Sequence, residues 1–71
     1  ADGAYLSNMI GIYTFLGNIY LRRSGDVRAA RACMESILEV SKNSPYRSEL
    51  MGGLDVLIFS IRLSHYEGKM A

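Results

Sequence analysis

Residues 4–21 read AYLSNMIGIYTFLGNIYL, a stretch without a charged side chain that ends at Arg22-Arg23. At ~100° per residue on a helical wheel, its large apolar side chains cover an arc of roughly 200°, about twice the stripe of an ordinary surface helix. They are Leu6, Met9, Ile10, Ile12, Tyr13, Leu16, Ile19 and Tyr20. A helix of this kind has to be covered from two sides. We therefore expect the rest of the chain to be organised around it.

The remaining sector of this helix carries small uncharged side chains at a helical spacing, namely Ser7, Gly11, Thr14 and Asn18. Small side chains on one face allow the backbone of another helix to approach closely. We therefore expect Gly11, Thr14 and Asn18 to contact a partner.

The predicted architecture is all-α, an antiparallel helical hairpin with a third packed helix, in a single domain of residues 1–71. The first helix, about 4–23, ends at Ser24-Gly25, and Asp26 is a good N-cap for a second helix over about 26–42. A glycine followed at once by a capping aspartate leaves room only for a tight turn between antiparallel helices. The expected core face of the second helix consists of Val27, Ala30, Met34, Ile37, Leu38 and Ser41. Cys33 is interpreted as a small packed side chain.

The third helix is expected over about 45–66, with Ser44 as its N-cap and Pro45 at its first position. It has two apolar stripes. We expect the first to face the hairpin: Leu50, Met51, Leu54, Leu57, Ile58 and Ile61. The second lies on the opposite side, and four of its members are expected to bind a partner: Val56, Phe59, Leu63 and Tyr66. No segment has a strand pattern that competes with this interpretation.

Composition limits the function classes. A chain of 71 residues with 49% hydrophobic residues, 21% charged residues and a net charge of +1 is typical of a small globular protein. Such a domain buries only ~60% of the surface of its unfolded chain, so we expect its stability to depend on a partner. A single cysteine excludes an internal disulfide, and no Cys/His spacing suggests a metal site. We expect no metal or cofactor and a cytoplasmic location, and we expect no membrane span because Asn, Ser, Thr and Gly lower the hydrophobicity of residues 4–21.

Part of the hairpin resembles a tetratricopeptide repeat. Tyr13-x-x-Leu16-Gly17-x-x-Tyr20 is similar to the opening of that repeat with Tyr in place of Trp, Ala30-x3-Met34 is similar to its A-x3-F, and Pro45 to its closing proline. The resemblance implies one repeat-like hairpin plus a capping helix, with Gly17 allowing close approach of the second helix.

A second resemblance is to the helical export chaperones of flagellar and type III secretion systems, in particular the flagellin chaperone. It depends on the Gly25-Asp26 turn and on Leu54-Asp55-Val56-Leu57. This resemblance implies an export chaperone that binds another protein.

The functional expectation is a non-catalytic protein-protein interaction module, a helical adaptor or small export-chaperone-like subunit that buries apolar helix faces. Its partner would be a helical protein or another copy of the chain. We expect no enzymatic activity, because the only histidine, His65, lies near an apolar stripe and no convergent set of polar groups stands out. The alternative is a small nucleic-acid-binding domain that uses Arg22, Arg23, Arg28 and Arg31.

Overall fold

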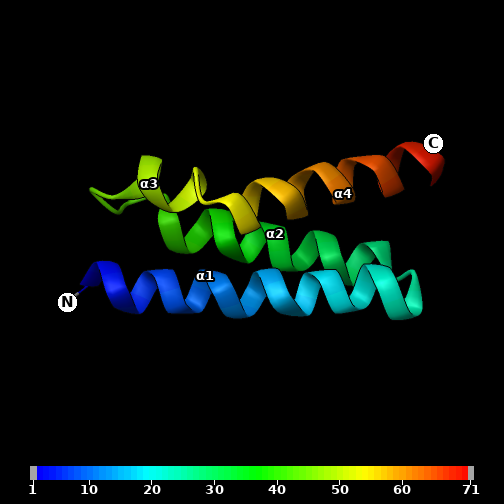
Figure 1. Cartoon of the computed structure of the whole chain (residues 1–71), viewed down its shortest axis with the longest axis horizontal. Helices are drawn as coiled ribbons and strands as arrows, with labels where there is room; N and C mark the ends of the chain where they lie inside the picture. Colours follow the sequence, from blue (N-terminus) through cyan, green and yellow to red (C-terminus); the bar gives the residue numbers. More distant parts are fainter. Residues whose placement is uncertain (1, 71) are drawn as a thin grey trace.

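The computed structural model describes residues 2–70, which form helices packed along one long axis, 38 × 18 × 18 Å in extent (Figure 1). The prediction of an all-α chain is confirmed, because residues 2–70 contain no strand. The elements in chain order are α1 (Asp2–Ile19), a π-helical segment η1 (Tyr20–Ser24), α2 (Val27–Ser41), α3 (Arg47–Met51) and α4 (Leu54–Met70).

The turn predicted at Ser24–Asp26 is confirmed. Gly25 adopts the left-handed conformation (φ 61°), which glycine reaches without steric cost, and its N–H donates to the Tyr20 carbonyl. The carboxylate of Asp26 then accepts a hydrogen bond from the Ala29 N–H at 3.0 Å and caps α2. As a result α2 returns alongside α1 (Figure 1).

The third helix differs from the prediction, because residues 45–66 are not one helix. Two consecutive glycines, Gly52 and Gly53, divide it into α3 and α4, since glycine costs ~1 kcal/mol relative to alanine in a helix interior. Ser44 does not begin a helix directly: its hydroxyl accepts the Tyr46 N–H at 3.0 Å, which stabilises a turn before α3 begins at Arg47. The helix α4 continues to Met70, beyond the predicted end at residue 66.

The hydrophobic core lies among α1, α2 and α4. On α2, the prediction that Val27, Ala30, Met34 and Ile37 face the core is confirmed, and Cys33 is buried as a packed side chain. The remaining buried apolar residues are Ile10, Leu21, Val56, Phe59 and Leu63.

The expected rotation of the last helix about its own axis is wrong. Phe59 is fully buried, whereas Leu54 and Ile61, expected to face the hairpin, are 73% and 69% exposed. Gly17 on α1 explains this orientation, because a Cβ there would lie 2.2 Å from Cζ of Phe59. Gly17 thus makes room for an aromatic ring of α4. The repeat resemblance implied instead that Gly17 allows close approach of the second helix.

Candidate interaction surface

The outer face of α1 carries large apolar side chains that no described part of the chain covers. Ile12 is 60% exposed and Phe15 66%, and Leu16, one residue further on, is also exposed. Positions i, i+3 and i+4 share one face of a helix, so these three form a continuous apolar surface. They line a shallow groove together with Gly11, where an added Cβ would meet nothing within 4 Å.

The outer face of α4 is apolar as well. Its exposed members are Leu54, Leu57, Ile58 and Ile61, at positions i, i+3, i+4 and i+7. This stripe lies on the side of α4 opposite Phe59, which packs on Gly17. These four residues, expected to face the hairpin, are therefore on the surface of α4, whereas Leu50 and Met51 of α3, expected to face it as well, are half-buried and pack against the core.

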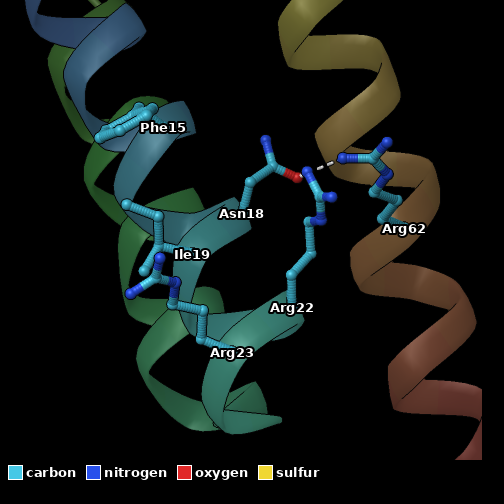
Figure 2. Close-up of a pocket in the computed structure, with 6 residues that line it drawn as sticks. All are labelled: Phe15, Asn18, Ile19, Arg22, Arg23 and Arg62. Carbon is cyan, nitrogen blue, oxygen red and sulfur yellow. Dashed lines mark hydrogen bonds between the residues drawn. The ribbon is translucent and has the colours of Figure 1, made fainter.

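A basic pocket lies at the boundary between α1 and α4 (Figure 2). Its lining residues are Phe15, Asn18, Ile19, Arg22, Arg23 and Arg62. The side chain of Asn18 joins the two helices, because its Oδ1 accepts a hydrogen bond from Nη1 of Arg62 at 3.0 Å. Its Nδ2 donates to the Thr14 carbonyl at 3.0 Å, which fixes the orientation of the amide. Figure 2 shows the guanidinium groups of Arg22 and Arg62 both on the α4 side of Asn18, with that of Arg22 beside the Asn18–Arg62 hydrogen bond.

The π-helical segment η1 supplies two of the three pocket arginines. It carries both Arg22 and Arg23 in its last turn, and π-helical turns within α-helices occur frequently at functional sites. In Figure 2, Arg22 extends toward α4, whereas Arg23 extends away from it. Among the residues that the structure describes, none forms an ion pair with Arg22, Arg23 or Arg62. The pocket therefore presents uncompensated positive charge next to the apolar faces.

The arginines of the predicted nucleic-acid cluster do not act as one group. Nε of Arg31 donates to Oε2 of Glu67 at 2.7 Å, and Nη2 donates to the other carboxylate oxygen. This pair connects α2 to α4. Its hydrogen bonds raise the pKa of Arg31 and lower the pKa of Glu67. Arg31 is thus paired with Glu67 within the fold, while Arg62, which is not part of the predicted cluster, lines the pocket with Arg22 and Arg23.

Most of the predicted partner-binding residues are not on this surface. On α4, Val56, Phe59 and Leu63 are buried, so the expectation that they form an exposed stripe is wrong; Tyr66 packs against the same core and is half-buried.

The three predicted partner-binding residues of α1 are in different environments. Thr14 is buried, and its hydroxyl donates to the Ile10 carbonyl at 2.7 Å. The side chain of Asn18 accepts a hydrogen bond from Arg62 of the same chain. Gly11 does lie in a surface groove. Phe15, which the sequence analysis did not single out, is among the most exposed apolar residues; its position between Ile12 and Ile19 on one helix face is the signal that could have identified it.

The side chains considered for catalysis or metal binding, His65 and Cys33, do not form one site. His65 packs edge-on against Tyr66, with the ring centroids 6.2 Å apart. Cys33 is buried, and burial raises the pKa of its thiol. Within the described part of the chain, no three His, Cys, Asp or Glu residues are grouped so that they could hold a metal ion.

The described helices include none with the length and apolar character needed to cross a membrane. Comparison with family models, curated proteins and solved structures found no match to this chain. The resemblances to a tetratricopeptide repeat and to flagellin export chaperones therefore depend on the sequence motifs alone.

Proposed function

We propose that this chain is a non-catalytic protein-interaction module, a helical adaptor or export-chaperone-like subunit, that binds another helical protein surface through the outer faces of α1 and α4. The observation that supports the proposal is the exposure of Ile12, Phe15, Leu54 and Ile61, each 60% or more accessible. Scattered apolar residues are normal on a protein surface, but contiguous exposed apolar faces mark interaction sites.

The energetic argument concerns what these side chains gain from a partner. Complete burial of a Leu, Ile or Phe side chain contributes ~1.5–3 kcal/mol. Since Leu54 and Ile61 retain about two thirds of their accessible surface, covering each one contributes roughly 1–2 kcal/mol. Arg22, Arg23 and Arg62 border the apolar faces, and a polar border around an apolar centre is the usual composition of a protein interface.

Site-specific photo-crosslinking in the source cells tests this function. A benzophenone amino acid replaces Phe15, and the matched control carries it in place of Arg28, an exposed position on α2. We expect a discrete protein adduct from position 15, absent from position 28, that disappears when Leu54→Ser and Ile61→Ser are added. Circular dichroism checks that these variants remain helical. Equal labelling from both positions, or an adduct that survives the serine substitutions, contradicts the proposal.

A further inference from the structure

We propose that the basic pocket and the apolar groove of α1 together bind an amphipathic helix of another protein, one whose first turn carries acidic side chains and which lies antiparallel to α1. This inference rests on the proposed function, because it states the chemistry of the partner on the α1 side. The continuity of the two surfaces, the charge at one end and the direction of α1 support this assignment.

The apolar groove and the basic pocket are continuous along one side of α1, because Phe15 lines both of them. Gly11 and Ile12 precede Phe15 in the groove. Ile19 and Arg22 follow it in the pocket. At ~100° per residue, these five positions fall within one arc of roughly 100° on α1 and the start of η1. A partner helix binds such a surface by laying its successive apolar side chains along it.

The pocket end of this surface is basic. Arg62 donates one hydrogen bond to Oδ1 of Asn18, so most of the five N–H donors of its guanidinium group remain for a ligand. The guanidinium group of Arg22 lies beside that hydrogen bond (Figure 2). Two neighbouring guanidinium groups repel each other, and a carboxylate relieves this repulsion while accepting two parallel N–H donors from an arginine. An acidic side chain is therefore the ligand that fits this end.

The carboxylates nearest to the pocket arginines along the chain have other partners. Asp26 caps α2, and Asp55 accepts the N–H of the residue that follows it. Glu67 pairs with Arg31. Residues 4–21, which form most of α1, contain no acidic side chain. We therefore expect the partner to supply the negative charge that the described residues do not place at the pocket.

The direction of α1 sets the direction of the bound helix. Arg22 and Arg23 lie in the last turn of η1, whereas the groove begins near Ser7. Acidic side chains are favoured in the first turn of a helix, because its N-terminus carries partial positive charge. A helix whose acidic first turn lies over the arginines therefore runs antiparallel to α1, with its apolar side chains over Phe15 and Gly11. The surface from Ser7 to Arg23 is about 24 Å long, which accommodates a helix of about four turns.

The surroundings of the arginines favour an acidic helix over a nucleic acid. Phe15, which is 66% exposed, and Ile19 lie among the pocket arginines, and the apolar groove extends from them. Binding to a nucleic acid depends on a basic surface that contacts many phosphates. This chain has a net charge of +1, and Arg31 is paired within the fold.

Matched synthetic peptides test the charge and the direction. Each is an amphipathic helix of about four turns with a leucine face; the first has glutamates in its first turn, the second has glutamines there, and the third has the glutamates in its last turn. Fluorescence anisotropy with the purified chain should show that the first peptide binds about tenfold more tightly than the other two. This difference should narrow at high salt, because exposed charges are screened.

Arg22→Glu tests the pocket itself. Arg22 is exposed, so the variant should keep its helical content by circular dichroism while its affinity for the first peptide falls about tenfold. A peptide with lysines in its first turn should bind Arg22→Glu more tightly than it binds the wild type. Arg28→Glu is the matched control, because Arg28 is exposed on α2 outside this surface, and it should leave the affinity for the first peptide unchanged.

Equal affinity for the glutamate and glutamine peptides overturns the inference, and so does an Arg22→Glu chain that binds the first peptide as tightly as the wild type does. A short DNA duplex that displaces the first peptide at equal concentration also overturns it, because the arginines would then serve a nucleic acid. The proposed function is judged separately: a protein adduct from position 15 that persists in Arg22→Glu supports that function and contradicts the acidic partner.

Discussion

Replacing Gly17 by alanine tests the contact that orients α4. The new Cβ would lie 2.2 Å from Cζ of Phe59, whereas ordinary van der Waals contact begins at 3.4 Å, so the ring has to retreat by about 1.2 Å (3.4 minus 2.2). The ring is fully buried and cannot move into solvent. Relief therefore requires displacement of α4 or of neighbouring core side chains.

Two effects of opposite sign determine the expected magnitude. Gly→Ala in a helix interior is favourable by ~1 kcal/mol through backbone propensity, while overpacking a well-packed core costs ~1–3 kcal/mol and occasionally more. Because the overlap with Phe59 is severe, we place the packing cost near the upper end and expect a net loss of about 2 kcal/mol in the free energy of unfolding. For a domain of this length, that loss lowers the melting temperature by roughly 8–16 °C.

Gly11→Ala is the matched control, since Gly11 is in the same helix and its added Cβ meets nothing within 4 Å. Gly11→Ala should stabilise the chain by ~0.5–1 kcal/mol. Urea unfolding followed by circular dichroism, at one fixed protein concentration, measures both variants. In a Phe59→Leu background the loss from Gly17→Ala should shrink, because the shorter side chain leaves room for the methyl group. A Gly17→Ala protein as stable as Gly11→Ala would refute the reasoning and place Phe59 elsewhere.

Three further predictions concern the cap, the ion pair and the thiol. Asp26→Ala should lower the free energy of unfolding by ~1 kcal/mol because the Ala29 N–H loses its acceptor; a urea titration that gives no change contradicts the cap. Arg31 lowers the pKa of Glu67. The Arg31–Glu67 pair therefore stabilises the folded state fully above the ordinary pKa of 4.5, and this stabilisation is lost as pH falls through the lowered pKa. The difference in urea midpoint between wild type and Glu67→Gln should therefore shrink below pH 4.5, and a constant difference down to about pH 3 would count against the pair. Cys33 is buried with a raised thiol pKa, so a thiol-specific disulfide reagent should react slowly with the native chain and rapidly in urea; equal rates would show that the thiol is accessible.

The parts of the fold that could be predicted from the sequence depend on local signals. Gly25 and Asp26 determine a turn by backbone conformation and capping, which requires no knowledge of distant residues. The second helix has one apolar face and one charged face, so its core residues follow from periodicity alone. The prediction of one third helix over about 45–66 is wrong, because Gly52 and Gly53 divide this segment into α3 and α4.

The rotation of α4 could not be predicted, because the helix has two stripes of similar hydrophobicity. Periodicity identifies both stripes and does not rank them. The ranking comes from shape: only the stripe containing Phe59 has an aromatic ring that fits over the side-chain-free surface at Gly17, about forty residues earlier in the chain. The basic pocket could not be predicted for the same reason, since Arg62 reaches Asn18 only when α4 has this rotation.

The rotation of α4 about its own axis also determines which residues remain exposed and available for binding. Rotating α4 so that Phe59 enters the core necessarily turns Leu54 and Ile61 outward. The helix α1 is apolar over most of its circumference, but only one of its sides is buried against α2 and α4. The described residues 2–70 supply no further helix for these faces, and the exposed stripes of both helices consist of large apolar side chains. The proposed function assigns these exposed apolar residues to a partner. Because Gly17 contacts Phe59 and so sets the position of α4 relative to α1, a substitution there should disturb the proposed interaction surface as well as the core, although Gly17 itself is buried.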